Sequence, residues 1–220
     1  MNTLKFVSFC IYGIYCILAE TSKAHLMSEF WLYVQLGFYH VLDWKAYDHI
    51  LFLTVLAVSF SADHWKKVLW AVTAFTLGHT IALFLSIYKV VSINKNMIEF
   101  LIPVTILITA IFVVVRSGSL KQQALSPVFI GITIFFGLIH GFGFSNYFKV
   151  ISSNTGAKLI PGLSFATGIE LSQLLLVVVV LLVGFLVQQF FKVAERDWVL
   201  VIASVVIGMT IPMVQNNWIF

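Results

Sequence analysis

Charged side chains are scarce in this sequence. Asp, Glu, Lys and Arg make up 10% of its 220 residues, whereas hydrophobic residues make up 60%. Soluble domains carry about 25% charged and about 45–50% apolar residues, so the composition excludes an ordinary soluble domain and indicates an integral membrane protein. The net charge of +4 lies in short segments between apolar runs. It therefore reflects membrane topology and does not indicate a nucleic-acid-binding face.

Cysteine is almost absent as well. Both cysteines, Cys10 and Cys16, lie in the N-terminal stretch MNTLKFVSFCIYGIYCILAETSKAH, so no disulfide framework is indicated. Two enzyme signatures are also missing: the GxxxxGK[ST] loop that cradles nucleotide phosphates and the HExxH pair of zinc proteases. No segment of about 20 to 50 residues recurs, which excludes a repeat architecture.

Residues 1–24 have the pattern of a secretory signal peptide, with a basic start, a short apolar run and a polar end. Ser22 and Ala24 occupy the −3 and −1 positions of a cleavage site. Cleavage there leaves His25 as the mature N-terminus, where it is a candidate metal contact. Two alternatives stay open: an uncleaved N-terminal anchor helix, or a true start at Met27.

Apolar segments fill the rest of the chain, residues 25–220, which we predict to form a single transmembrane domain. A hydrocarbon core about 30 Å thick takes about 20 helical residues to cross. Residues 29–42 reach only about 20 Å at about 1.5 Å per residue, so they predict a half-helix. Six longer segments are predicted to span the membrane: 45–61, 67–90, 97–115, 126–147, 160–188 and 198–214. The predicted fold class is an all-α, polytopic transmembrane helical bundle of about six spans with a short N-terminal half-helix.

The lysines and arginines between these spans predict the orientation of the chain. If residue 25 starts outside the membrane, six of them fall in inside connections and four in outside connections. The inside set is Lys66, Lys67, Arg116, Lys121, Lys192 and Arg196, and the outside set is Lys89, Lys95, Lys149 and Lys158. The positive-inside rule therefore favours a mature N-terminus outside. The expected location is a bacterial-type inner membrane.

Ionisable side chains occur inside these apolar segments, where each costs about 2.5–3.5 kcal/mol at mid-bilayer. Such residues normally face the interior of the bundle and mark a site or a pathway. Those found in successive spans are Asp48, His49, His79, Glu99, His140 and Glu170. Glu99 differs from the others because it opens its span beside Lys95, and we interpret it as an anchor at the membrane interface.

Imidazole nitrogens together with carboxylate oxygens, and without thiolates, suit nickel, cobalt, zinc or copper(II). Magnesium or calcium would require more oxygen ligands and no histidine. A proton relay also uses His, Asp and Glu, but it needs no adjacent Asp-His pair such as Asp48 and His49.

The stretch HVLDWKAYDH predicts a bend in the chain. On one unbroken helix, His40 and His49 would point to opposite sides, since residues nine apart lie about 180° around the axis. To share an ion, the chain must bend between Asp43 and Lys45, so that a half-helix folds back and directs His40 toward Asp48 and His49. Asp43 is also the predicted N-cap of the helix that follows.

Other polar and small residues lie one helical turn from the candidate ligands. Thr76 precedes His79 by three residues and Gln173 follows Glu170 by three, so each pair shares a helix face. Thr76, Gln173 and Asp43 are therefore candidate outer partners that orient the ligands. Glycines beside the histidines let helices approach closely or leave room for a ligand; they are Gly78, Gly137, Gly141 and Gly143.

Four stretches carry a resemblance to the HupE/UreJ family of small membrane proteins, regarded as nickel and cobalt permeases. They are GFYHVLDWKAYDHILFL, TAFTLGHTIAL, GLIHGFGFSNYF and FATGIELSQLL, within residues 28–185. The resemblance implies that His40, Asp48 and His49 contact the metal, and that further polar positions of the pathway follow at His79, His140 and Glu170.

The chain departs from the family signature in one respect. The signature usually places five residues between its histidine and the Asp-His pair, whereas this chain has seven, VLDWKAY. The longer spacer leaves two alternatives open: a changed ion preference, or a site without His40.

The expected function is secondary or passive transport of a divalent transition-metal ion, with nickel or cobalt first and zinc next. The bilayer and the ion are its expected partners, and a homo-oligomer or an accessory transport partner stays open. The alternative is an intramembrane zinc-dependent hydrolase acting on a lipid or acyl substrate, with histidines and Asp48 on zinc and Glu170 as general base. A third alternative is a metal-sensing or assembly subunit.

Overall fold

The computed structural model describes residues 26–60, 64–117, 126–152 and 158–219. Within these ranges the chain is helical apart from turns and short connections, and no strand is present. A first helix covers residues 26–41. It is followed by α2 (Asp48–Val58), α3 (Trp65–Ile87), α4 (Lys95–Arg116), α5 (Pro127–Ile151), α6 (Leu159–Phe191) and α7 (Glu195–Asn216). The predicted all-α class is confirmed, while the predicted signal peptide and His25 lie outside the described residues.

Five of the described helices, α3 to α7, are long and apolar enough to cross a membrane. The predicted span over residues 45–61 differs from the structure, because only the 11 residues of α2 are helical there. At about 1.5 Å per residue, α2 covers about half of a hydrocarbon core. The residues directly before Asp48, which were predicted to belong to the span, form a turn instead, so α2 is shorter than predicted. Within the described residues, the chain therefore runs from the helix of residues 26–41 through a turn into the short helix α2.

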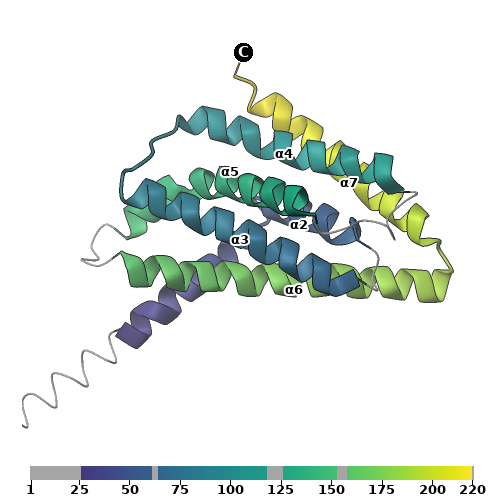
Figure 1. The fold of residues 1–220 in the computed structure, drawn as a ribbon, viewed down its shortest axis with the longest axis horizontal. Coiled ribbons are helices and arrows are strands. Elements are labelled where there is room, and N and C mark those ends of the chain that lie inside the picture. Colours follow the sequence, from purple (N-terminus) through teal and green to yellow (C-terminus); the bar gives the residue numbers. More distant parts are fainter. Residues whose placement is uncertain (1–25, 61–63, 118–125, 153–157, 220) are drawn as a thin grey trace, which may run out of the picture.

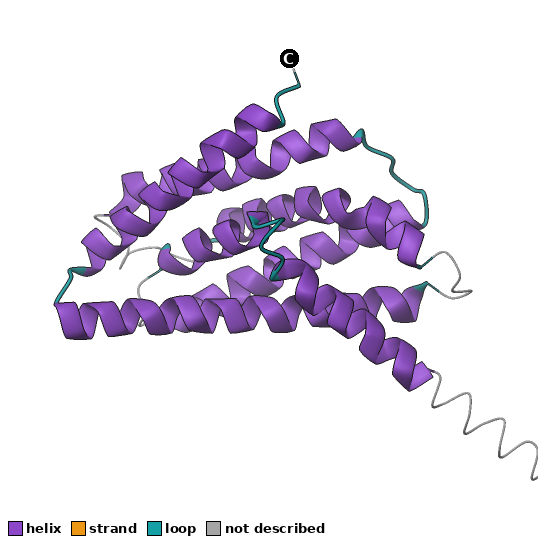
Figure 2. Cartoon of the chain, turned by 180° about the vertical axis from the view of Figure 1, so that it is seen from behind, coloured by secondary structure: helices purple, strands orange, loops and turns teal. Residues whose placement is uncertain are grey.

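The short helix α2 lies at the centre of the bundle. In Figure 1, α6 runs along one side, α4 and α7 run together along the other, and α2, α3 and α5 lie between them. Figure 2 shows the same arrangement from behind. Eight of the 11 residues of α2 are buried, and the helix packs against α3, α4, α6 and α7. A helix enclosed on all sides needs apolar residues around its whole circumference, which explains why the sequence of α2 reads like a membrane span.

Glycines bring α3 and α5 into close contact. A Cβ added at Gly78 would overlap a backbone carbonyl of α5, and a Cβ added at Gly137 or Gly141 would overlap a backbone carbonyl of α3. Gly137 and Gly141 form a GxxxG spacing, which permits close approach of membrane helices. His79 on α3 and His140 on α5 lie beside this contact, so the glycines bring both histidines to one interface.

A second pair of glycines joins the first helix to α6. A Cβ added at Gly37 would overlap the carbonyl of Phe165, and one added at Gly168 would overlap the carbonyl of Val34. Because His40 lies one helical turn after Gly37, this contact fixes the end of the first helix that carries the histidine.

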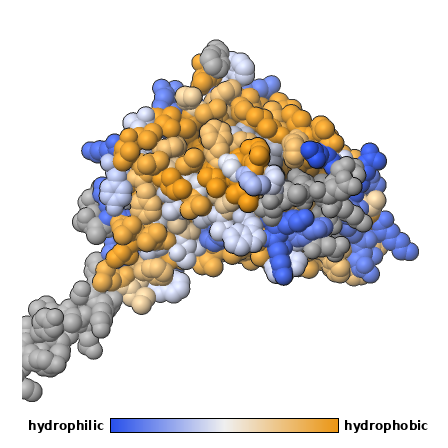
Figure 3. Space-filling view, in the orientation of Figure 1, coloured by the Kyte–Doolittle hydropathy of each residue, from blue (hydrophilic) through white to orange (hydrophobic). Residues whose placement is uncertain are grey.

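The outer surface of the bundle is apolar. Hydrophobic side chains cover most of the face shown in Figure 3, and hydrophilic residues gather near its edges. The exposed residues of α6 include Leu171, Leu175, Val178 and Leu182. Together with the five long apolar helices, this surface identifies an integral membrane protein surrounded by lipid.

Candidate functional site

The residues between His40 and His49 form a turn that joins two helices. The first helix ends one residue after His40, and α2 begins at Asp48. The ring centroids of His40 and His49 consequently lie 4.8 Å apart. The bend predicted from the HVLDWKAYDH stretch is therefore confirmed, and the seven-residue spacer still brings the two histidines into contact.

Asp43 stabilises this turn and does not cap α2. Its Oδ1 accepts a hydrogen bond from the backbone N–H of Lys45 at 2.9 Å, and its carbonyl accepts one from the N–H of Ala46 at 3.1 Å. The N-cap of α2 is Tyr47, whose side chain makes no capping hydrogen bond. The prediction of an Asp43 N-cap is wrong because the exposed carboxylate bonds within the turn, five residues before the helix begins.

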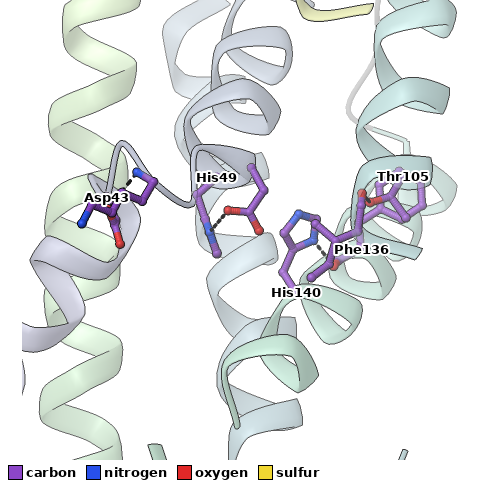
Figure 4. Close-up of polar contacts among 8 residues, drawn as sticks. Asp43, His49, Thr105, Phe136 and His140 are labelled. Carbon is purple, nitrogen blue, oxygen red and sulfur yellow. Dashed lines mark hydrogen bonds and ion pairs between the residues drawn. The ribbon is translucent and has the colours of Figure 1, made fainter. Parts of the chain in front are cut away.

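Four histidines from four helices lie close together. His49 on α2 lies 5.8 Å from His79 on α3 and 5.3 Å from His140 on α5, measured between ring centroids. His40 on the first helix lies 6.1 Å from His79. Figure 4 shows His49 and His140 from neighbouring helices in this region. We call His40, His49, His79 and His140 the histidine cluster; residues distant in sequence meet here in one place.

Three members of the cluster are spaced for a shared ion. One ligand nitrogen from each of His40, His49 and His79 lies within 4.8 Å of the other two. Two nitrogens bound to one tetrahedral ion at about 2.0–2.1 Å lie about 3.4 Å apart. The cluster thus needs to contract by about 1.4 Å at most, which side-chain rotation can supply. His140 lies beside this triad through its contact with His49.

Hydrogen bonds orient two of the rings. The carboxylate Oδ1 of Asp48 lies 3.2 Å from Nδ1 of His49, and the carbonyl of Phe136 lies 2.9 Å from Nδ1 of His140. Both oxygens are acceptors, so Nδ1 carries the proton in each ring, and Nε2 of a neutral imidazole then carries the lone pair. An acceptor behind a ring N–H is the usual support of a metal-binding histidine.

Five buried ring nitrogens of the cluster lack hydrogen-bond partners among the residues that the structure describes. They are Nε2 of His40, His49 and His140 and both ring nitrogens of His79. His79, His140 and His49 are 0%, 1% and 2% exposed. Burying a polar group without a partner costs about 1–3 kcal/mol of folding free energy. Five such ring nitrogens in one place therefore indicate a site for a bound species that imidazole coordinates, such as a metal ion.

Phenylalanine rings enclose the histidine cluster. The centroid of Phe144 lies 3.9 Å from that of His40, and those of Phe52 and Phe75 lie 5.4 and 5.1 Å from that of His140. Apolar walls lower the local dielectric, which strengthens the attraction between the Asp48 carboxylate and a cation. The cluster is thus a nitrogen-rich group of side chains, packed against aromatic rings, with one negative charge at its edge.

A model of a known protein family matches nearly the whole chain. It is described as HupE / UreJ protein, and the match covers residues 18–218. The chain belongs to the HupE/UreJ family. No curated protein and no solved structure matches the chain significantly. The resemblance seen in the four sequence stretches is therefore confirmed at the level of the family.

In this HupE/UreJ protein, Glu170 lies apart from the histidine cluster. Its Oε1 accepts a hydrogen bond from the hydroxyl of Thr73 at 2.7 Å, where α3 meets α6. Within the described ranges, no ring contact or hydrogen bond joins Glu170 to a histidine. Its predicted place in a pathway stays a prediction, but the structure assigns it to a separate set of contacts.

Thr76 and Gln173 also bond to each other instead of to the histidines. The hydroxyl of Thr76 lies 2.8 Å from Oε1 of Gln173. The predicted role of these residues as partners that orient the ligands therefore differs from the observed contacts. The groups that contact ring nitrogens of the cluster are the carboxylate of Asp48 and the carbonyl of Phe136.

The sequence carries a signal for the enclosing phenylalanines that the predictions did not use. Each of them lies three or four residues from a histidine on the same helix, so it shares that histidine's face. The pairs are His49 and Phe52, His79 and Phe75, and His140 and Phe144.

Proposed function

We propose that this HupE/UreJ protein carries a divalent transition-metal ion, nickel or cobalt, across the membrane by way of the histidine cluster. The observation that carries the proposal is the convergence of four histidines, three of them buried and one half-buried, each with a buried ring nitrogen that is unpartnered in the described chain. The association of the family with nickel and cobalt transport agrees with this donor set.

The chemistry of the cluster supports an ion that must be both bound and released. Imidazole and carboxylate ligands favour nickel, cobalt and zinc over magnesium and calcium. The cluster offers no thiolate, whose bond to a soft metal would slow release. Transport requires binding strong enough to replace the hydration shell of the ion and weak enough to let the ion leave.

The turn before α2 supports an access route to this cluster. Residues 43–46 are exposed, including the charged Asp43 and Lys45. Irregular backbone at membrane depth is tolerated only where protein or water covers it. The side chain of Asp48, 15% exposed, lies directly after this turn. An ion approaching through a hydrated recess would therefore meet Asp48 before the triad.

We further propose a bacterial-type inner membrane with the mature N-terminus outside. The distribution of lysine and arginine over the connections supports this orientation. It places the connection before α3 inside and the connection between α3 and α4 outside.

The proposal is tested by uptake of nickel and cobalt into proteoliposomes. His49→Ala is expected to lower uptake at least about tenfold, because the ring contacts the other three histidines and one of its nitrogens belongs to the triad. His64→Ala is the matched control, since His64 precedes α3 outside the cluster, and it is expected to transport like the wild type. Equal uptake by wild type and His49→Ala would show that the route bypasses the cluster.

Asp48→Asn tests the support of His49 separately. An amide keeps the size of the side chain but removes the charge, and loss of such a partner weakens metal affinity by about 10- to 100-fold. Calorimetric titration with cobalt measures the change. Asp43→Asn is the control, because the amide oxygen still accepts from Lys45; an unchanged affinity in Asp48→Asn would contradict a role for its charge.

A zinc-dependent hydrolase is the second candidate, and the compactness of the triad favours it. Three histidines around one ion with an open fourth position are typical of catalytic zinc. However, Glu170, the predicted general base, lies in other contacts, at the junction of α3 and α6. Cleavage of phospholipid by zinc-loaded wild-type protein, without ion uptake, would favour this candidate over transport.

A further inference from the structure

A second polar cluster lies where α3 meets α6. The hydroxyl of Thr73 donates to Oε1 of Glu170 at 2.7 Å, and the hydroxyl of Thr76 donates to Oε1 of Gln173 at 2.8 Å. The two threonines lie one turn apart on α3, and Glu170 and Gln173 lie one turn apart on α6, so the two hydrogen-bonded pairs are neighbours. We call these four residues the oxygen cluster.

The oxygen cluster lacks a positive charge. Oε2 of Glu170 is buried and has no hydrogen-bond partner in the described part of the chain, and the side chain of Gln173 is 0% exposed. Neither ion pair of the described chain involves Glu170. Acidic residues in membrane helices normally pair with a counter-charge or face a water-filled cavity. Glu170 lines an open groove and has no counter-charge in the described part of the chain. A cation bound in the groove would supply that charge.

The donor atoms select the class of cation. Two hydroxyl oxygens, one amide oxygen and the carboxylate are hard ligands, which suit alkali and alkaline-earth ions and not nickel or cobalt. Each hydroxyl oxygen still has lone pairs available for a cation while its O–H donates a hydrogen bond. One carboxylate balances one positive charge, which favours a monovalent ion. The few oxygens favour Na+ over K+, a larger ion that takes more ligands.

An open groove reaches three of the four residues of the oxygen cluster. It has a volume of about 450 Å³, and Thr73, Thr76 and Glu170 line it. Thr80 and Thr167 continue the row of hydroxyls along the groove, toward the ends where α3 finishes and α6 begins. Hydroxyl oxygens along this line supply a polar path through a lining that otherwise consists of leucines and Ala166.

We propose that Thr73, Thr76, Glu170 and Gln173 form a sodium-binding site, separate from the histidine cluster. The site differs from the histidine cluster in its ligands and in the groove that reaches it, although α3 contributes residues to both. An occupied site would let a sodium gradient drive metal movement; that use rests on the proposed function, whereas sodium binding itself does not.

Binding of radioactive sodium to the purified full-length chain in lipid nanodiscs tests the site, in buffer freed of transition metals. We expect saturable binding that excess Na+ displaces and excess K+ does not. Glu170→Gln should abolish it, and the isosteric Thr73→Val should weaken it by about tenfold. Glu99→Gln is the matched control, because that carboxylate pairs with Lys95 at 3.1 Å and should bind sodium normally.

Three outcomes overturn the proposal: no saturable binding by the wild type, undiminished binding by both Glu170→Gln and Thr73→Val, or equal displacement by K+. Helical circular dichroism verifies that each variant is folded. His49→Ala should bind sodium like the wild type. A negative result for metal transport therefore does not contradict the sodium site, and a negative result for sodium binding does not contradict metal transport through the histidine cluster.

Discussion

Replacing His79 with leucine is expected to stabilise the metal-free protein while it removes nickel and cobalt binding. Both ring nitrogens of His79 are buried without partners in the described chain, and the residue is 0% exposed. Each such group costs about 1–3 kcal/mol, and leucine fills a similar volume without polar atoms. Unfolding in mixed detergent micelles measures the free energy, and cobalt titration measures the loss of affinity, which we expect to exceed about 100-fold.

The opposite signs of the two effects make this prediction decisive. A histidine that only joins helices would lose stabilising contacts when replaced, so the free energy of unfolding would fall. A histidine positioned to bind a metal lowers the free energy of unfolding of the metal-free protein, because binding sites commonly trade stability for function. His64→Leu is the control and should change neither quantity. A destabilised His79→Leu that still binds cobalt would assign His79 a structural role.

Gly137→Ala is expected to destabilise the bundle and to weaken metal binding together. The added Cβ would overlap the backbone carbonyl of Phe75, so α3 and α5 must move apart. Overpacking of this kind costs about 1–3 kcal/mol and sometimes more. The displacement also separates His79 from His140, which lie beside this contact. Thermal unfolding and cobalt titration of the same preparation measure both effects.

Gly131→Ala provides a matched control on the same helix. A Cβ at Gly131 meets nothing within 4 Å in the described part of the chain. Alanine favours helix over glycine by about 1 kcal/mol, so this variant should be as stable as the wild type or slightly more stable. Similar melting temperatures for Gly137→Ala and Gly131→Ala would show that the close approach of α3 and α5 tolerates a methyl group.

The sequence predicted the class, the bend after His40 and the residues of the histidine cluster. Each of these predictions depended on a strong local signal: a low charge content, a helical spacing that separates His40 from His49, and imidazoles in apolar segments. The ion pair of Lys95 with Glu99 likewise supports the interpretation of Glu99 as an anchor, since four residues on a helix place the two side chains together.

The length of α2 and the contacts of Glu170 could not be predicted from the sequence. An apolar run has the same composition whether lipid or protein surrounds it, so the buried α2 resembled a span. Helical spacing places Glu170 and Gln173 on one face of α6, but it does not say which neighbouring helix that face meets. The contact with Thr73 and Thr76 depends on how α3 packs against α6, and only the tertiary structure specifies it.

The longest of the described helices, α6, has a consequence for the surrounding membrane. α6 comprises 33 residues, about 50 Å at about 1.5 Å per residue, whereas the hydrocarbon layer measures about 30 Å. A tilt within the usual range of about 0–40° absorbs only part of the difference. The excess length must protrude among the lipid headgroups or thicken the bilayer around it. Hydrophobic mismatch at α6 thus links the position of the oxygen cluster to the thickness of the host membrane.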